Sequence, residues 1–265
     1  MIVVRPKGVT LPLPCLATTA EGERAYFAEP SMIKGLGINP DKARRGVAPS
    51  GEEWYPNVEG FGRLTVFIPG NPGAGKSYLA NDFINLILPS SEVLLFTALE
   101  EEDGNFEGLK GRLYKIRMDT DNLDRLTLTQ IRRMCKNPIL LFDDIDKIRD
   151  KNVEKKTFAL LEDALANGRG HKKHDGEGDI HVIVTSHSLN DYRKTKYTLE
   201  NSDYVAVFPQ STTYAQMKRL FDKLGLSKEL CDEVIQMGKN GLARRVIIKK
   251  VSPMYIIMGD IIELI

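Results

Sequence analysis

A glycine-rich loop over residues 70–77 carries residue types that can hold phosphate. Gly70, Gly75, Lys76 and Ser77 fit the pattern G-x-x-x-x-G-K-[ST], between a run typical of a strand and a run typical of a helix. Backbone N–H groups of such a loop point at phosphate oxygens, the lysine reaches the β- and γ-phosphates, and the hydroxyl ligates Mg²⁺. The alternative is a glycine-rich turn before an ordinary helix. The pattern favours a nucleotide site formed by Gly70, Asn71, Pro72, Gly73, Ala74, Gly75, Lys76, Ser77 and Tyr78.

Two adjacent acids end another apolar run. In "PILLFDDID", Asp143 and Asp144 follow a run of four apolar residues. A buried strand delivers carboxylates in this way to the carboxyl edge of a parallel sheet, where ligands bind. We expect Asp143 to hold Mg²⁺ through water and Asp144 to orient and polarise an attacking water, whereas Asp146 should cap the following turn. Taken alone, the run would fit equally well a strand that ends in a solvated acidic turn.

A third apolar run, "HVIVTSHS", ends in hydroxyl residues. In a sheet of this type it should lie between the strand before the loop and the acidic strand, so that Thr185 or Ser186 faces the γ-phosphate. That is the position of a phosphate sensor. The alternative is that both residues merely end a strand.

A basic loop, "ANGRGHKKHDGEGD", precedes this run and contains Arg169, Lys172 and Lys173. An arginine at a subunit edge can stabilise the charge of a γ-phosphoryl group bound by a neighbouring subunit. Basic loop residues can also contact the phosphate backbone of DNA. A solvated charged loop is the alternative for the two lysines.

The order of the elements that must position these residues predicts an α/β fold. Strand-like runs alternate with amphipathic helix-like runs, which implies a mostly parallel sheet with helices on both faces. We expect an additional-strand P-loop NTPase with a core over 61–210, an N-terminal appendage over 1–60 and a C-terminal extension of helices and strands over 211–265. The strand-like runs are 63–69, 92–98, 111–118, 138–144, 179–186, 204–209, 243–250 and 254–262, and the helix-like runs are 75–88, 122–136, 153–168, 213–225 and 228–238.

Composition sets outer limits on function. The 265 residues are 42% hydrophobic, enough for a sizeable core, and no apolar run approaches the ~18 residues that span a bilayer. No leader pattern begins the sequence, so we expect an intracellular protein with reduced thiols at Cys15, Cys135 and Cys231. Lysine plus arginine (37) balances aspartate plus glutamate (36), so local clusters must bind any polyanion. Without acidic or cysteine partners at ligand spacing, surface or strand-end positions are predicted for His171, His174, His181 and His187.

Several motifs together resemble one family. "GNPGAGKS", "LLFDDID", the "GRG" loop, "VIVTSHS", "YVAVFPQS" and "ARRVIIKKVSPMYI" occur in an order similar to that of the FtsK-HerA superfamily, specifically the poxvirus-type genome packaging ATPases, with relatives in giant viruses and virophages. The resemblance covers residues 63 to about 258. It implies an ATP-driven motor that threads double-stranded DNA into a preformed capsid and works as a ring homo-oligomer, usually a hexamer. It also implies a capsid or portal vertex as partner, and the host cytoplasm, a virus factory or the virion as location.

The resemblance assigns roles to individual residues. Lys76 and Ser77 match the family's phosphate and Mg²⁺ positions, Asp143 and Asp144 its acidic pair, and Ser186 its sensor. Arg169 resembles the arginine supplied in trans, although this chain inserts "HKKHDGEG" between that arginine and the next strand; Arg244 and Arg245 are further arginines that could serve the nucleotide. Expected tracks for DNA are "DKIRDKNVEKK" and "HKKHD".

Two other functions remain open at this point. An AAA-type replication helicase or helicase loader would share the loop and the acidic pair, and the helices over 213–238 could pass for its lid. The β-like runs that follow those helices favour the packaging type instead. A non-catalytic capsid or scaffold component could keep a nucleotide for stability alone, but such a site would be free to lose Asp143 and Asp144, which are both present.

Overall fold

The computed structural model describes residues 1–29, 44–57, 62–98, 104–109, 111–170, 178–187, 189 and 192–265. These residues form two compact units. Unit 1 combines Met1–Phe61 with Ala206–Ile265, and unit 2 is Gly62–Val205. The phosphate-loop motif, the acidic strand and the run over 181–186 all belong to unit 2. The domain boundaries expected at residues 60 and 210 stay a prediction.

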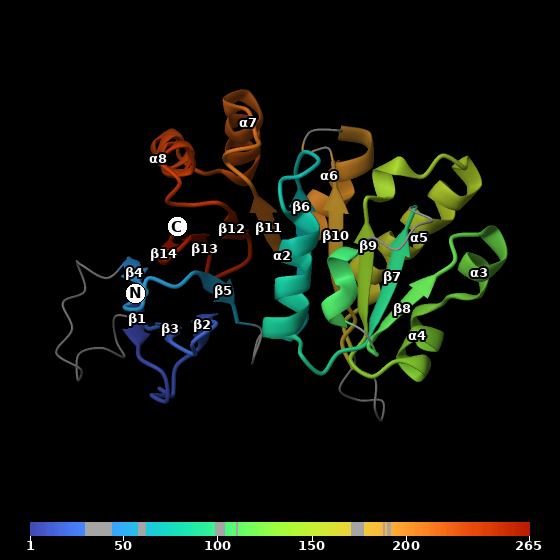
Figure 1. Ribbon diagram of the computed structural model, residues 1–265, viewed down its shortest axis with the longest axis horizontal. Coiled ribbons are helices and arrows are strands. Elements are labelled where there is room, and N and C mark those ends of the chain that lie inside the picture. The colour runs from blue at the N-terminus through green and yellow to red at the C-terminus, as the bar shows by residue number, and fades with distance from the viewer. Residues whose placement is uncertain are drawn as a thin grey trace. The chain divides into compact units, whose positions relative to one another are not determined.

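A parallel sheet forms the centre of unit 2 (Figure 1). Its strand order is β11-β6-β10-β9-β7-β8, and each of these pairings is parallel. All residues of β6, β9 and β10 are buried, as expected for strands covered on both faces. The position of β10 between β6 and β9 confirms the expectation for the 181–188 run. The strands are β6 (Thr65–Pro69), β7 (Val93–Thr97), β8 (Leu113–Ile116), β9 (Ile139–Asp143), β10 (His181–Ser186) and β11 (Tyr204–Val207).

Helices flank this sheet on both faces. α2 leads from β6 to β7, whereas α5 leads from β9 back to β10, so the two connections cross the sheet in opposite directions. Because such crossovers are right-handed, α2 and α5 lie on opposite faces, and Figure 1 shows α2 in front of the sheet. This architecture confirms the predicted fold class. The helices are α2 (Lys76–Asp82), α3 (Thr120–Arg125), α4 (Leu128–Met134), α5 (Lys151–Asn167) and α6 (Tyr192–Asn201).

Some expected elements of unit 2 are wrong in detail. The single helix predicted over 122–136 is two helices, because Thr127 begins α4 with a capping box. The Thr127 hydroxyl accepts the Gln130 N–H at 3.3 Å, and the Gln130 side chain accepts the Thr127 N–H at 2.9 Å. The helix predicted over 75–88 continues past α2 as a π-helical turn, Phe83–Ile87. The sequence did not predict α6, nor the 3₁₀ turns Gly104–Leu109 and Ile145–Lys147.

In its described residues, unit 1 contains two antiparallel sheets and two helices. The first sheet has the order β1-β3-β2-β5, and the second contains β4-β14-β13-β12. The expected N-terminal appendage contains five strands in its described residues, β1 to β5. The run over 254–262 is a hairpin that turns at Gly259, where φ is 63°. The elements are β1 (Ile2–Arg5), β2 (Cys15–Thr19), β3 (Arg24–Phe27), β4 (Arg45–Val47), β5 (Trp54–Pro56), α7 (Tyr214–Leu224), α8 (Lys228–Lys239), β12 (Val246–Lys249), β13 (Tyr255–Met258) and β14 (Ile261–Leu264).

Buried aromatic residues join the two ends of the chain within unit 1. The Trp54 indole N–H donates to the carbonyl of Asp260 at 2.8 Å. The Tyr255 hydroxyl donates to the carbonyl of Leu16 at 2.9 Å. Both rings are almost fully buried, and each polar atom has a partner, as buried Trp and Tyr require. The N-terminal and C-terminal segments therefore share a core.

His181, the first residue of β10, is a buried neutral base. Its Nδ1 atom accepts the backbone N–H of Leu64 at 3.0 Å, so the histidine helps to start the pairing of β10 with β6. Burial, aided by the positive charge of Arg63 and opposed by Asp179, lowers the pKa of His181 to about 4. The folded state therefore keeps this ring neutral in a pH range where an unfolded histidine takes up a proton.

We predict that His181 makes the protein less stable as pH falls below about 6.5. The pKa of His181 is lower in the folded state than in the unfolded state, so unfolding takes up a proton between pH 6.5 and 4. As pH falls through this range, the free energy of unfolding decreases by about 1.4 kcal/mol per pH unit and by about 3 kcal/mol in all. His181→Asn keeps an acceptor for Leu64 and does not titrate. Urea unfolding at several pH values should show a shallower pH dependence for this variant, and equal slopes would contradict the prediction.

Candidate functional site

The phosphate-loop motif forms an open turn at the carboxyl end of β6. The Gly70 N–H donates to the carbonyl of Ser186 at 2.9 Å, which ties the loop to the end of β10. Gly73 (φ 76°) and Gly75 (φ 102°) adopt the left-handed conformation that glycine permits. Within the described residues, the N–H groups of Gly73 and Gly75 donate to no acceptor. These two donors, followed by the N-terminus of α2, fit the phosphates of a nucleotide.

Lys76, the first residue of α2, projects into the carboxyl edge of the sheet. Its side chain is only 6% exposed. The ammonium lies 3.5 Å from the carbonyl of Asn71, 3.4 Å from Nδ1 of His187 and 3.7 Å from Oδ1 of Asp144. A buried lysine needs such partners to keep its charge. Elsewhere in the motif, Ala74 and Ser77 are half-buried and the exposed residues are Asn71, Pro72, Gly73 and Tyr78.

The acidic pair is held by one hydroxyl from the neighbouring strand. The Thr185 hydroxyl donates to Oδ1 of Asp143 at 2.7 Å and accepts the backbone N–H of Asp144 at 2.9 Å. Asp143 is the last residue of β9, and Asp144 follows it in a left-handed conformation (φ 48°, ψ 41°), which aspartate tolerates better than most residues. Both carboxylates are buried. The left-handed turn lets Asp144 reach Lys76.

The structure distinguishes between the two hydroxyls at the end of β10. Side chains alternate along a strand, so Thr185 and Ser186 point to opposite faces. Thr185 contacts the aspartates, whereas the backbone carbonyl of Ser186 accepts the Gly70 N–H. Ser186 as a sensor stays a prediction. Thr185 is the hydroxyl that joins the acidic strand to β10.

His187 completes this cluster, and the sequence did not predict it. Its Nε2 atom lies 2.7 Å from Oδ2 of Asp144. An ammonium can only donate, so Nδ1 accepts from Lys76 and Nε2 carries the hydrogen that faces the carboxylate. The available signal was its position two residues after Thr185, on the same side of an extended chain. The sequence predicts only a surface or strand-end position for His187, which directly follows β10.

The carboxylate of Asp144 contacts three basic side chains, those of Lys76, Lys147 and His187. Lys147, from the 3₁₀ turn that follows, places its ammonium 3.3 Å from Oδ2 of Asp144. Burial by itself would raise the pKa of Asp144, but Lys76, His187 and Lys147 outweigh that effect and hold the pKa below its usual value. The carboxylate is therefore ionised near neutral pH. An ionised carboxylate beside the phosphate loop is suited to orient and polarise water.

Asp146 does not have the predicted capping role. Its carboxylate accepts the backbone N–H of His187 at 3.2 Å. Asp150 provides the next cap, since its Oδ1 atom accepts from Asn152 at 2.8 Å and from Val153 at 3.0 Å at the start of α5. The chain turns between β9 and α5, which brings Asp146 back to the end of β10. In the described ranges, no group of three His, Cys, Asp or Glu residues could hold a metal ion by itself.

Arg169 lies at the opposite edge of the same sheet. It follows α5, where the Gly168 carbonyl accepts the N–H of Ile180 just before β10 begins. The carboxyl end of β10 lies six residues farther, or roughly 20 Å. Arg169 is exposed and cannot reach the phosphate loop of its own chain. Lys172 and Lys173, with the expected track "HKKHD", lie outside the described residues.

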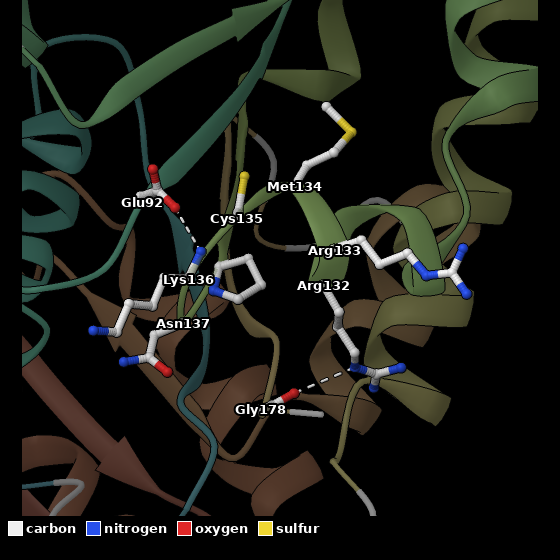
Figure 2. A pocket seen from close by; sticks show the side chains of 9 residues that line it. Glu92, Arg132, Arg133, Met134, Cys135, Lys136, Asn137 and Gly178 are labelled. Atoms are coloured by element: carbon white, nitrogen blue, oxygen red, sulfur yellow. Dashed lines mark hydrogen bonds between the residues drawn. The ribbon is translucent and has the colours of Figure 1, made fainter. Parts of the chain in front are cut away.

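Arg132 fixes the segment that carries Arg169. Its guanidinium donates to the carbonyls of Gly178 (3.2 Å), Asn167 (3.2 Å) and Arg169 (3.3 Å), and Figure 2 shows the bond to Gly178. The same side chain lines a cavity of about 500 Å³ at this amino edge (Figure 2). A cation at the C-terminal end of α5 also suits the helix dipole. No local sequence pattern predicts this contact.

The other two arginines considered for the nucleotide belong to unit 1. Arg245 forms an ion pair with Glu53 at 2.7 Å and stacks over the Tyr55 ring, 4.5 Å from its centroid. Arg244 is exposed. Arg245 is therefore held by contacts inside its own unit, whereas Arg169 points into solvent.

Among curated proteins, the chain is similar to a virophage protein. No family model matches the chain. Uncharacterized protein V3 of Sputnik virophage is 27% identical over 241 residues, which cover 89% of this chain and 87% of that protein. Among the described helices, none combines the length and the apolar character needed to cross a bilayer.

Solved structures of low sequence identity were also found. The genome packaging NTPase B204 from Sulfolobus turreted icosahedral virus 2, in complex with AMPPCP, is 14% identical with a TM-score of 0.42, covering 74% of this chain and 97% of that one. The cytoplasmic domain of the Type VII secretion ATPase EccC from Thermomonospora curvata is 13% identical with a TM-score of 0.46, covering 94% and 29%. The pCW3 conjugation coupling protein TcpA, with ATPgS, is 11% identical with a TM-score of 0.44, covering 93% and 74%. The chemistry of the site rests on this chain's own residues.

We predict that the Thr185 hydroxyl stabilises the carboxyl edge of the sheet. Thr185→Val leaves the buried N–H of Asp144 without its acceptor and removes one donor from Asp143, which should lower the free energy of unfolding by about 1–3 kcal/mol. Thr185→Ser keeps the hydroxyl and is the matched control. In urea denaturation, Thr185→Ser should have a higher free energy of unfolding than Thr185→Val. Equal values would show that these hydrogen bonds contribute nothing to stability.

Proposed function

We propose that this chain is an ATP-hydrolysing motor of the FtsK-HerA superfamily that moves double-stranded DNA into a viral capsid. One observation carries the hydrolytic part of the proposal. The buried ammonium of Lys76, which follows the phosphate loop, contacts the ionised carboxylate of Asp144, which follows the acidic strand. A phosphate-binding cation and a water-orienting carboxylate thus share one edge of the sheet.

ATP would change the contacts of Lys76. The β- and γ-phosphates offer the ammonium stronger partners than the carbonyl of Asn71, so Lys76 would turn from Asp144 toward the nucleotide. Asp144 would then accept a hydrogen bond from the water that attacks the γ-phosphoryl group. His187 would keep the carboxylate in place through its Nε2–H bond. The Gly70–Ser186 hydrogen bond would transmit phosphate binding to β10.

Ser77 and Asp143 fit the two positions at which this class of site holds Mg²⁺. Ser77 lies one residue after Lys76 and is half-buried, and the carboxylate of Asp143 is buried at the end of β9. Oxygen donors of this kind suit Mg²⁺. When bound, Mg²⁺ supplies neutralisation of phosphate charge.

The position of Arg169 is consistent with the ring assembly that the family resemblance implies. The nucleotide loop and Arg169 lie at opposite edges of one sheet, so one subunit could offer its arginine to the nucleotide of the next. Arg132 would act as a positioning residue because it holds the backbone of Arg169. A ring homo-oligomer, usually of six subunits in this family, would give every interface a complete site.

The remaining parts of the proposal follow from the family resemblance. DNA would pass basic residues of the segment 146–156, of which Lys147, Arg149, Lys151 and Lys155 are exposed. Contacts with phosphates carry no base information, so binding would be tolerant of sequence and sensitive to salt. A capsid or portal vertex would anchor the ring, in the infected cell or the virion.

A helicase or loader and a scaffold component remain the alternatives. After α7 and α8 the chain forms the antiparallel strands β12, β13 and β14, which favours the packaging type over a purely helical lid. The ionised Asp144 beside Lys76 favours a hydrolytic site over a nucleotide kept for stability.

We predict that long duplex DNA stimulates steady-state ATP hydrolysis by the full chain. A motor that moves along a phosphate backbone couples turnover to that contact, so duplex should raise the rate more than single strands do. Greater stimulation by single strands would support the helicase alternative. Absence of turnover under all conditions would support the scaffold.

Two variants separate nucleotide binding from turnover in the same assay. Lys76→Ala removes a charged contact with the phosphates and should weaken ATP binding roughly 10- to 100-fold, measured with a fluorescent ATP analogue. Asp144→Asn keeps the size of the side chain and should retain binding but lose at least about a hundredfold in turnover. Unchanged affinity in Lys76→Ala would refute the nucleotide site.

We predict that Arg169 acts across a subunit boundary. Arg169→Ala should retain ATP binding and reduce turnover about a thousandfold, as loss of an arginine finger does. Mixing Arg169→Ala with Asp144→Asn subunits creates interfaces in which both groups are intact, so the mixture should regain part of the activity. If two inactive variants remain inactive after mixing and joint assembly, Arg169 does not serve a neighbouring site.

A further inference from the structure

A second cavity opens at the carboxyl edge of the sheet in unit 2, on the far side of the acidic strand from the phosphate loop. Its volume is about 1220 Å³. Thr97 lines this cavity at the end of β7 and is the register partner of Asp143 on β9. The ends of β7 and β8 and the segment after β9 contribute to its walls. The cavity thus lies beside the acidic pair.

Basic side chains dominate the described lining of this cavity. It includes four cationic residues, Lys115, Arg117, Lys147 and Arg149, all exposed. Its two acids, Asp119 and Asp150, both cap helices.

These helix caps reduce the free acidic charge of the cavity. Asp119 accepts the N–H of Asn122 at the start of α3 and also pairs with Arg117, 3.2 Å away. Asp150 accepts two backbone N–H groups at the start of α5, and these bonds lower its pKa. A carboxylate that accepts N–H groups at the N-terminus of a helix has part of its charge neutralised by the positive end of the helix dipole. The described lining therefore carries more positive than negative charge.

The shape and lining fit a phosphate backbone better than a free nucleotide. The described lining includes no aromatic ring on which a base could stack. Its cations stand on long, flexible stems, and the side chain of Arg117 is 87% exposed. Such side chains can follow consecutive phosphates of a duplex without reading its bases.

Lys147 belongs both to this cavity and to the candidate catalytic cluster. Its side chain is 46% exposed, and its ammonium lies 3.3 Å from Oδ2 of Asp144. The same oxygen accepts from Nε2 of His187 at 2.7 Å. One carboxylate oxygen thus faces both the Lys147 ammonium and the Nε2–H of His187. Lys147 therefore competes with water for this oxygen.

We propose that phosphates of duplex DNA in this basic cavity draw Lys147 away from Asp144 and so free the carboxylate to accept the attacking water. The inference rests on the proposed function and adds a mechanism of DNA stimulation to it. ATP would withdraw Lys76 from Oδ1, and DNA would withdraw Lys147 from Oδ2. Asp144 would be fully available only when both ligands are bound. Lys147 is a positioning residue in this scheme, because it acts through Asp144.

The test compares variants of the full chain for ATP hydrolysis without and with long duplex DNA. Lys147→Met keeps the length of the stem but removes the charge. We expect its DNA-free rate to rise about three- to tenfold, a part of what a positioned general base contributes, and its stimulation by DNA to fall toward one. Lys218→Met, an exposed lysine of α7, is the matched control and should behave as the wild type. Lys147→Arg restores a cation and should restore stimulation.

A binding measurement examines the cavity separately. Fluorescence anisotropy with a labelled duplex of about 30 base pairs should show weaker binding for Lys147→Met and for Arg149→Met. Each variant should reduce the slope of log affinity against log salt by about one, because one phosphate contact is lost. An unchanged salt slope in both variants would remove the cavity as the DNA site.

Failure of this inference differs from failure of the proposed function. If duplex stimulates the wild type and Lys147→Met keeps the wild-type DNA-free rate and stimulation, the chain is still a DNA-dependent ATPase but Lys147 does not couple the two sites. If the wild type and Lys218→Met hydrolyse ATP without any response to duplex, both the translocase function and the coupling are wrong. Circular dichroism of each variant identifies loss of folding.

Discussion

The ionic contacts of one buried carboxylate organise the carboxyl edge of the central sheet. Asp144 lies within 3.7 Å of Lys76, within 3.3 Å of Lys147 and within 2.7 Å of His187. A charge in a site of low dielectric is costly unless it is paired, and its pairs are strong for the same reason. Two residues distant in sequence, Lys76 and His187, therefore converge with the neighbouring Lys147 on Asp144. Any ligand that competes for one of these partners also changes what the carboxylate can do.

The parallel topology provides this convergence. β10 lies between β6 and β9, so the phosphate loop, the acidic pair and Thr185 all lie at the carboxyl ends of adjacent strands. The same topology sends α5 back to the amino edge, where Arg132 holds the segment of Arg169. The chain therefore has the phosphate-loop motif at one edge of the sheet and the exposed Arg169 at the other, as the proposed function needs. That polarity is what a head-to-tail ring requires.

Local sequence signals were reliable where backbone geometry and burial dominate. Glycines at 73 and 75 mark left-handed positions, and the apolar runs mark strands buried on both faces. The signals failed where a single side chain decides. Thr127 divides one amphipathic run into α3 and α4 through a capping box, and Asp146 bonds to the backbone of His187 rather than capping a turn. Amphipathic periodicity continues across such a break, so the pattern alone does not reveal it.

The sequence by itself determined the fold class, the nucleotide motif and the acidic pair, because glycine spacing, apolar periodicity and adjacent carboxylates are properties of short segments. Only the tertiary structure decided which groups meet. The left-handed turn at Asp144 directs its carboxylate to Lys76, the strand period selects Thr185 over Ser186 as the hydroxyl on the aspartates, and strand order brings His187 beside both charges. These contacts join residues more than forty positions apart, and no local propensity encodes a pairing over that separation.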